Sequence, residues 1–530
     1  MAQNNKATGN EPQPIPIMDW YDIWAGTVGW GGHGGPSYPQ DVPQGVRLAL
    51  QPAKQTEPFL RRERPWEAYF NYMHVLHDEG RYRFWYSASP DPETVERLGI
   101  ALVGGGGYPD FTCYAESDDG FHWERPNLGM YNFAGSTDNN IITEGGMSNP
   151  QGWHIYQVFK DPTAPPDERY KSNCQAGVWI KDGVRLKAMT KPEIKEMRDQ
   201  LQLEGLNREE IGRRLTMQFQ VLGFVSPDGI HWRRLPEAIL EPPGRLDMRN
   251  MVFCDEEKRE YVAYLRGHTG RRRTLRRSVS KAFAHGWQNP PQEVFAPDSQ
   301  DPPYVDFYDF GYCRQPGSPY HLMFFSLYNR ATDTMDIHLA VSRNGFVWTR
   351  PERRAIITNE IPGGSGEHYA VIYPSPGLIP LGDDWWGQAY FAHTHCHWEF
   401  DYEKWAFYEP SGAYHWGMWK RDRLVGLEAP MEGRVAMLER QCAGQQLLLN
   451  YKTGRGGWIK AELCGTIGSL QPTRVAPFEG FTFDESDFLT GDSLSAPVAW
   501  RGRTDLSSLK GRPVSVRLHI FNATLFSVAI

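Results

Sequence analysis

The stretch SDDGFHWERP, which runs from Ser117 to Pro126, places a tryptophan three residues after an Asp-Gly pair. Such a pair supplies the positive-φ residues that a tight hairpin turn requires, and the tryptophan is suited to covering the face of a sheet. Close copies follow as SPDGIHWRRL, from Ser226 to Leu235, and as SRNGFVWTRP, from Ser342 to Pro351. One copy predicts a hairpin, whereas three copies predict a repeated architecture.

The repeat extends over five units between about residues 66 and 427, and each unit holds an apolar strand, an aromatic strand and the turn. In the third unit the turn is degraded to SKAFAHGW, ending at Trp287, and in the fifth the Asp-Gly pair has disappeared. Four-stranded blades around a central axis hide their sheet edges by closing into a ring, so each unit needs its neighbours. The sequence therefore predicts a five-bladed β-propeller, and a β-sandwich with chance similarity between its segments is the alternative.

Two segments depart from the repeat. The segment from Thr190 to Leu215 has a capping-box start at Thr190 and Glu193, helical apolar spacing and a break at Gly205, which predicts a helical hairpin inserted in the second blade. From about residue 431, short alternating strands predict a compact β-sandwich. We therefore expect an all-β protein with an N-terminal extension at 1–65, a catalytic propeller at 66–430 and an accessory β-sandwich at 431–530.

The net charge of the chain limits the kinds of molecule that it is expected to bind. The chain of 530 residues has a net charge of −8 and a pI of about 6.1. Because nucleic acids and anionic membranes favour a basic face, this balance argues against both. The run RRRTLRR, from Arg271 to Arg277, is the one basic exception. It is either a solvated strand face with ion pairs or a site for a phosphate or carboxylate group of a substrate.

Seven cysteines are spread along the chain without CxxC spacing, so no zinc ribbon or dense disulfide framework is indicated. Their odd number favours a reducing compartment. The segment MAQNNKATGNEPQPIP is polar and contains no apolar signal core, and the chain has no run of about 18 apolar residues. We expect a cytoplasmic protein without a cofactor.

Acidic side chains stand near the predicted opening of every inner strand, the strand of each blade that lines the axis. They are Glu67, Asp161, Asp247, Asp306 with Asp309, and Glu367, which is followed by His368. Because all inner strands of a propeller open around one funnel, we expect these side chains to converge. Two carboxylates that flank a glycosidic bond are the minimum for its cleavage, one as proton donor and the other as nucleophile or base.

This arrangement resembles the five-bladed propeller glycosidases, above all glycoside hydrolase family 32 and its relatives in families 43 and 68. The stretch FKDP, from Phe159 to Pro162, is similar to the Arg-Asp-Pro motif of family 32, with Lys160 in place of the arginine. The resemblance implies that Asp161 stabilises the transition state. The last strands, from Val516 to Ser527, resemble those of the β-sandwich that follows the propeller in family 32.

Two motifs of that family are absent. The Asn-Asp-Pro-Asn-Gly motif with the nucleophile is missing, and Glu67, preceded by Trp66, stands in its place. The Glu-Cys motif of the acid is missing as well, and Asp247 is its nearest positional equivalent. The resemblance implies that Glu67 and Asp247 share the roles of acid/base and nucleophile, with the order left open, while substrate and stereochemistry are not carried over.

The stretch AHTHCHWEF carries His393, His395 and His397 at alternating positions. In a strand this spacing puts the three side chains on one face, which suits a metal site, hydrogen bonds to sugar hydroxyls or a structural role. We expect no metal ligand among the site residues. The side chains assigned to substrate binding are Trp66, Asp306, Asp309, Glu367, His368, His393 and His395.

Together these features predict a glycoside hydrolase that cleaves an oligosaccharide or glycoside with paired carboxylates, a furanoside being one candidate. One alternative is a glycoside phosphorylase resembling family 130, in which Arg249, Arg266 and the run at 271–277 position phosphate. Another is a sugar-binding propeller without catalysis. We expect a carbohydrate as partner, no nucleic acid and no membrane, and the helical hairpin is a candidate contact between copies of the chain.

Overall fold

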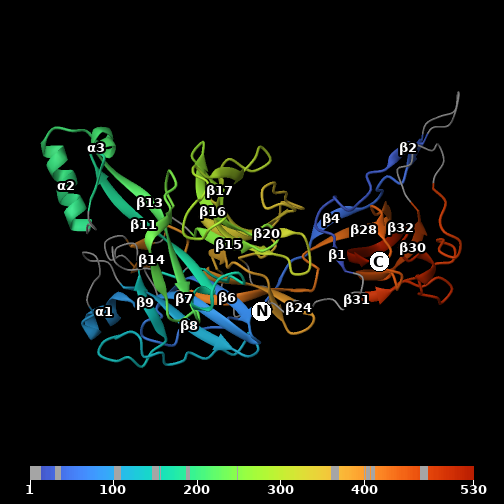
Figure 1. Ribbon diagram of the computed structural model, residues 1–530, viewed down its shortest axis with the longest axis horizontal. Coiled ribbons are helices and arrows are strands. Elements are labelled where there is room, and N and C mark those ends of the chain that lie inside the picture. The colour runs from blue at the N-terminus through green and yellow to red at the C-terminus, as the bar shows by residue number, and fades with distance from the viewer. Residues whose placement is uncertain are drawn as a thin grey trace.

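The chain folds into a ring of β-sheets and a second unit of long strands, which lie on the left and the right of Figure 1. The computed structural model describes residues 13–29, 38–100, 109–145, 154–155, 157–186, 191–246, 249–359, 369–398, 400–401, 406–407, 412–465 and 475–530. No helix in these ranges is long and apolar enough to cross a membrane.

The sheets of the ring are antiparallel blades. Blade one holds β6 (Tyr69–Asp78), β7 (Arg81–Ser89), β8 (Asp110–Ser117) and β9 (Ile141–Gly145), and blade two holds β10 (Val158–Lys160), β11 (Tyr170–Lys181), β13 (Leu215–Ser226) and β14 (Arg233–Leu240). Blade three holds β15 (Met251–Asp255), β16 (Glu260–Thr269), β17 (Arg272–Ser280) and β18 (Gln292–Phe295). Blade four holds β19 (Val305–Arg314), β20 (His321–Asn329) and β21 (Thr334–Ser342), and blade five holds β22 (Val371–Pro374), β23 (Ile379–Leu381), β24 (Trp385–His393) and β27 (Ala413–Lys420).

The five blades close into a ring. Strand β6 contacts β10 of blade two, β11 contacts β15 of blade three, and β17 contacts β19 of blade four. Strand β19 contacts β22 of blade five, and β24 of blade five contacts β6 of blade one. The outermost strand of blade five is β5 (Lys54–Gln55), which pairs with β27. This cyclic order confirms the predicted five-bladed β-propeller.

The inner strands, β6, β10, β15, β19 and β22, all begin at one end of the ring. They do so because strands alternate in direction within a blade, and the outer edge of each blade returns the chain to the end where it began. We call this end the N-face and the opposite end the C-face. Side chains near the first residues of the inner strands therefore surround the axis at the N-face.

The predicted helical hairpin is present in blade two, where α2 (Lys191–Leu203) and α3 (Arg208–Arg214) connect the ends of β11 and β13 at the N-face. Figure 1 shows both helices at the tip of this long strand pair. Ile194, Leu201 and Leu215 form a small apolar core of their own. Asn207 and Glu210 make the capping box of α3, whereas the predicted capping residue Thr190 lies outside the described residues. Other short elements are α1 (Pro92–Leu98) and β12 (Val184–Arg185).

The second unit is built on β28 (Val425–Ala436), β30 (Leu448–Cys464), β31 (Asp492–Pro497) and β32 (Pro513–Ala529), with β29 (Arg440–Gln441) at its edge. These strands bend at bulges and enclose an apolar core that includes Leu449, Ile459 and Leu518. Strands β1 (Ile15–Pro16) and β4 (Arg47–Leu50) from the N-terminal segment pair with β32 and β28, as the blue strands beside the red sheet show in Figure 1. The N-terminal extension therefore contributes to both units.

The repeated turn lies at the C-face, between the third strand of a blade and its outer edge. In blade one, the Ser117 hydroxyl accepts from the Gly120 amide, and the Asp119 carboxylate accepts from the amides of Phe121 and His122. Gly120 has φ +81°. A bridge between Glu116 and Glu124 closes this turn, so the expected tight hairpin is a wider loop held by side chains.

The same turns also join neighbouring blades. The carbonyl of Gly229, in the turn of blade two, accepts from Trp85 Nε1 of blade one at 2.6 Å. The carbonyl of Gly345, in the turn of blade four, accepts from the Tyr264 hydroxyl of blade three at 2.7 Å. Each turn is a latch between blades, which explains why its sequence recurs.

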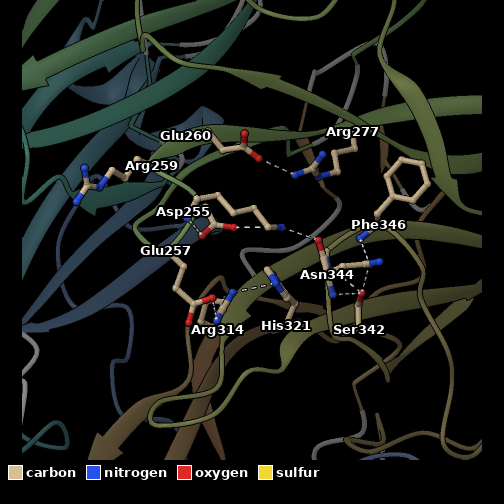
Figure 2. Close-up of polar contacts among 12 residues, drawn as sticks. Asp255, Glu257, Arg259, Glu260, Arg277, Arg314, His321, Ser342, Asn344 and Phe346 are labelled. Carbon is tan, nitrogen blue, oxygen red and sulfur yellow. Dashed lines mark hydrogen bonds and ion pairs between the residues drawn. The ribbon is translucent and has the colours of Figure 1, made fainter. Parts of the chain in front are cut away.

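Figure 2 shows ion pairs and hydrogen bonds that reinforce the latch between blades three and four. Arg314 of blade four lies 2.9 Å from the Glu257 carboxylate of blade three and donates to Nε2 of His321 at 2.9 Å. Lys258 of blade three donates to the Asn344 carbonyl of blade four at 2.9 Å. Burial, together with the charge of Arg314, lowers the pKa of His321 to about 3, so this ring stays neutral and structural.

Candidate functional site

Glu67 and Trp66 lie inside blade one, away from the axis. Glu67 is fully buried, and its two oxygens accept hydrogen bonds from the amides of Glu63 and Arg64, the Tyr86 hydroxyl and the Arg125 guanidinium. Trp66 is also buried and donates to the side chain of Asn140. The expectation that both side chains face the funnel is wrong, because β7 and the segment around Arg125 enclose them.

Asp161 lies at the C-face, because β10 ends at Lys160 and Asp161 follows it. Its carboxylate accepts from Thr163 and from the Tyr261 hydroxyl of blade three, and lies 3.0 Å from Lys171 Nζ. Burial raises the pKa of Asp161, but these hydrogen bonds outweigh burial and lower it overall. The predicted position at the opening of the inner strand is wrong, and Asp161 instead ties blade two to blade three.

Asp247, Glu367 and His368 lie outside the described residues. In the sequence, Asp247 precedes the first residue of β15, Met251, and Glu367 precedes the first residue of β22, Val371.

Asp306 is at the N-face, where its side chain is buried. One carboxylate oxygen accepts from Arg330 Nε at 3.0 Å, and the other accepts from the backbone amide of Arg273 at 3.1 Å. Asp306 therefore joins the β20–β21 hairpin to the start of β17. Its charge is compensated by Arg330.

Asp309 has the most unusual surroundings among the carboxylates that the structure describes at the N-face. It is fully buried in β19, and among the described residues neither oxygen has a partner in a well-formed hydrogen bond. The Arg249 guanidinium lies 3.6 Å away. Burial raises the pKa of Asp309 to about 6, although Arg249 offsets part of this shift. At pH 6 about half of such groups carry a proton.

Arg249 approaches Asp309 from the opening of β15. It donates from Nη1 to the Pro374 carbonyl of β22 at 2.8 Å, and its guanidinium lies over the Tyr72 ring of β6 at 5.1 Å. Its Nε and Nη2 atoms are buried and have no hydrogen-bond partner in the part of the chain that the structure describes. Residues of blades one, three, four and five thus meet at one point.

Three tyrosines near the openings of inner strands line this region. Tyr72, Tyr308 and Tyr373 are partly exposed, and the rings of Tyr308 and Tyr373 lie 6.1 Å apart. Burial raises the pKa of Tyr373, and the nearby Tyr308, Tyr72 and Asp309 raise it further, which places Tyr373 within electrostatic reach of all three. The Arg273 guanidinium stacks on the Tyr308 ring at 3.9 Å.

The histidines at 393, 395 and 397 lie at the N-face, but they do not share a strand. Strand β24 ends at His393, so the expected alternation on one strand face is wrong. His393 is buried and stacks on His395 with ring centroids 4.6 Å apart. His397 Nε2 lies 2.5 Å from the Tyr308 hydroxyl. No group of three His, Cys, Asp or Glu side chains within the described ranges is arranged to hold a metal ion.

Trp398 forms the outer rim of this region. Its side chain is 60% exposed, and its ring lies 5.1 Å from that of His397. The Asp333 carboxylate of the β20–β21 hairpin accepts from the Trp398 amide at 2.9 Å and from the Tyr328 hydroxyl at 2.6 Å. An exposed indole held on a fixed backbone can stack on one face of a sugar ring.

The described N-face therefore holds four of the predicted substrate-binding residues, Asp306, Asp309, His393 and His395. It excludes Trp66, Glu67 and Asp161. Sequence reasoning missed the tyrosines. A tyrosine stands close to the opening of three inner strands, in FNYM, DFYDF and VIYP, and this recurrence was a usable signal. Arg249 was noted only for a phosphate site, although it is the direct neighbour of Asp309.

Comparison with known proteins gives little information about the function of this chain. No family model and no curated protein matches the chain. Similar solved structures include a family-43 glycoside hydrolase at 10% identity and TM-score 0.39, covering 68% of this chain and 93% of that one.

Two further structures show the range of similar proteins. A family-32 β-fructofuranosidase from Bombyx mori is 9% identical with TM-score 0.38, over 89% of this chain and 93% of that one. An N-acetylgalactosamine deacetylase from F. plautii is 15% identical with TM-score 0.38, over 71% of this chain and 96% of that one. At such identities and TM-scores these likenesses carry no argument about the reaction, and the fold rests on the strand pairing described above.

Proposed function

We propose that this protein is a glycoside hydrolase whose proton donor is Asp309, with the substrate bound at the N-face of the propeller. The observation that carries the proposal is a fully buried carboxyl group with a pKa of about 6, whose ion-pair partner among the described residues, Arg249, lies 3.6 Å away. A general acid must hold its proton at the working pH and release it to the leaving oxygen, and a pKa near that pH serves this purpose.

The second carboxylate of the pair is proposed to be Asp247 or Glu367. Both precede the first residues of inner strands by four positions in the sequence. One of them acts as nucleophile in a retaining enzyme or activates water in an inverting enzyme. The variants Asp247→Asn and Glu367→Gln, made separately, identify the second carboxylate. We expect only one of the two substitutions to abolish turnover.

The rim and the wall of the site suit a sugar. We propose that Trp398 stacks on one sugar ring and that the tyrosine hydroxyls and His395 hydrogen-bond sugar hydroxyls. Trp398→Ala then raises KM with little change in kcat, because stacking at the rim stabilises bound substrate and transition state alike.

Glu67 and Asp161 are proposed to be structural carboxylates, since each is buried and already bonded to several donors. Of the carboxylates predicted from the sequence, Asp247, Asp309 and Glu367 are then the ones proposed to react with the substrate.

The test is a screen of aryl furanosides and pyranosides with the wild-type protein and Asp309→Asn. We expect wild-type turnover of at least one substrate, with kcat/KM falling as the pH rises above about 6 because Asp309 loses its proton. In Asp309→Asn we expect turnover to fall by about 10²–10⁴-fold. If the variant turns over that substrate as fast as wild type, Asp309 is not the proton donor.

A further inference from the structure

The outer face of the C-terminal sheet carries aromatic side chains. Trp458 of β30 stands opposite Phe521 of β32, and His519 precedes Phe521 by two positions on the same strand. Ile459 and Ile520 alternate with these residues and lie in the apolar core, so the three aromatic side chains point away from that core. Outward positions of an antiparallel sheet that faces water are usually polar. Aromatic rings gathered at such positions indicate a surface with a binding role.

Four rings make up this surface, and we call Trp458, Phe488, His519 and Phe521 the aromatic patch. The rings of Trp458 and Phe521 lie 5.8 Å apart and within 19° of parallel. Phe488 and His519 stand at 79° to the Trp458 ring, with centroids 5.2 Å and 4.8 Å from it. The Phe488 side chain is 61% exposed. Trp458 and Phe488 therefore form two walls of a corner that solvent reaches.

The backbone holds the patch in place. Strands β28 and β30 both change register against β32 between Ala523 and Phe521. Gly457 of β30 lies so close to β32 that a Cβ would stand 2.2 Å from the Asn522 carbonyl oxygen, and the Asn522 side chain donates to the Arg455 carbonyl at 3.1 Å. Bulges and glycines of this kind direct particular side chains. Rings fixed before binding lose little conformational freedom when a ligand arrives.

Hydrogen-bonding groups stand beside the rings. The Glu432 carboxylate accepts from Nε2 of His519 at 2.8 Å and lies 3.3 Å from the Arg434 guanidinium. The Lys460 ammonium group lies 4.7 Å from the centre of the Phe488 ring. The patch thus has both acceptors and donors at its edge. A sugar ring has an apolar C–H face for stacking and hydroxyl groups around its edge that donate and accept, so it matches this arrangement.

The size of the patch favours a sugar over a protein partner. Among the described residues of the C-terminal unit, the large apolar side chains that are exposed are Met431 and Phe488. A stable protein interface takes about 20–30 residues from each partner and has an apolar centre. Two exposed apolar side chains do not provide such a centre, whereas one sugar ring requires only an aromatic wall and a few polar groups.

We propose that the aromatic patch binds a carbohydrate chain, with a sugar ring stacked in the corner between Trp458 and Phe488. This inference goes beyond the proposed function, because the patch belongs to the C-terminal unit on the right of Figure 1, whereas Asp309 lies in the propeller on the left. Binding at the patch requires no turnover. If the propeller cleaves the same chain, attachment at the patch raises the local concentration of its glycosidic bonds.

Affinity electrophoresis in native gels tests the proposal. The full-length protein is run in gels that contain inulin, arabinan, xylan or polygalacturonate, and in a gel without polysaccharide. We expect at least one polysaccharide to retard the wild-type protein, and the retardation to increase with the polysaccharide concentration. If none of the four retards the wild-type protein, the proposal is overturned.

Phe488→Ala removes one wall of the corner, and Phe121→Ala is the matched control, because Phe121 is 37% exposed in the turn of blade one. We expect Phe488→Ala to weaken binding about tenfold and Phe121→Ala to leave it within a factor of about two. Since the Phe488 side chain is exposed, the fold is expected to survive, which circular dichroism checks. Equal retardation of Phe488→Ala and wild type places the polysaccharide elsewhere and overturns the proposal.

Trp458 distinguishes stacking from a structural effect. We expect Trp458→Phe, which keeps an aromatic ring, to bind within about threefold of wild type, and Trp458→Ala to bind about tenfold more weakly. Equally weak binding by both variants contradicts stacking on this ring. Sedimentation tests the other occupant, since a wild-type dimer that dissociates in Phe488→Ala would show that a second copy covers the patch, and would overturn the proposal.

Asp309→Asn separates this inference from the proposed function. We expect this variant to be retarded like wild type although it loses turnover, and Phe488→Ala to cleave a small aryl glycoside at the wild-type rate. Asp309→Asn that keeps both turnover and retardation contradicts the role of Asp309 alone. Loss of retardation in Asp309→Asn places the polysaccharide in the propeller and contradicts the aromatic patch.

Discussion

At the scale of single residues, Asp309 gives the stability of the protein a distinct pH dependence. Its pKa is about 6 in the folded chain against an ordinary value of 3.8, so the folded state holds a proton that the unfolded chain releases between these values. The folded state is therefore favoured below pH 3.8, and this contribution is lost as the pH rises through about 6. The loss amounts to about 3 kcal/mol.

Asp309→Asn tests this dependence. The amide does not titrate, so between pH 4 and pH 8 the free energy of unfolding of the variant rises by about 2 kcal/mol relative to that of wild type, part of the unfolded wild-type chain being ionised already at pH 4. Urea unfolding of both proteins at the two pH values measures the difference. A constant difference between them across this range contradicts a raised pKa at Asp309.

Glu67 provides the contrasting residue. It is bonded to Arg125 and Tyr86 inside blade one, so Glu67→Gln loses a charge-assisted pair and is expected to lower stability by about 1–3 kcal/mol. Turnover by the folded variant is expected to stay within a factor of about three of wild type, since the side chain does not reach the N-face. Loss of turnover in a Glu67→Gln protein that remains folded restores a catalytic role for this residue.

At the scale of elements, the repeated turn holds neighbouring blades together. Trp85 of β7 donates to the Gly229 carbonyl, and Gly229 has φ +78° with the Trp85 ring 2.8 Å from where a Cβ would stand. Both the conformation and the close approach therefore require glycine at this position.

Trp85→Phe removes the donor that comes from blade one, while the Gly229 carbonyl keeps its hydrogen bond from Trp232 Nε1 in its own turn. We expect the free energy of unfolding to fall by about 1 kcal/mol, the usual contribution of one hydrogen bond. Trp20→Phe is the matched control, because Trp20 is 45% exposed and is expected to tolerate the change. Denaturant unfolding compares the two, and equal effects contradict the latch.

At the scale of the whole molecule, the N-terminal segment connects the propeller to the C-terminal unit. Asp22 accepts hydrogen bonds from Arg343, in the turn of blade four, and from Arg440 of β29. Its side chain is buried, so this carboxylate links the two units away from water.

Asp22→Asn weakens this link. We expect calorimetry to show two separated unfolding transitions, or a wider separation than in wild type, because the units no longer stabilise each other through this carboxylate. Asp484→Asn, at an exposed position of the C-terminal unit, is the control. An unchanged transition in Asp22→Asn shows that the other contacts between the units suffice.

The fold was predictable because its signal is local and repeated. The turn at Ser117 returns in three blades, and its glycine and aspartate or asparagine act within a few residues of each other. The site was less predictable because its contacts join distant segments. Arg125, which lies 58 positions further along the chain, donates a hydrogen bond to the Glu67 carboxylate and keeps it inside the blade. The stretch around Asp161 is similar to a catalytic motif, but Asp161 follows the end of β10 and therefore lies at the C-face. Neither fact is visible in the motif itself.

Leaving-group dependence tests the central claim, that Asp309 is the proton donor of a glycosidase, most directly. The measurement compares kcat/KM of wild type and Asp309→Asn on two glycosides of the preferred sugar, one with a 2,4-dinitrophenyl and one with an alkyl leaving group. A dinitrophenolate leaves without a proton, so we expect the variant to lose about 10²–10⁴-fold on the alkyl glycoside but less than about tenfold on the dinitrophenyl glycoside. Equal losses on both substrates, or no loss on either, would contradict the claim.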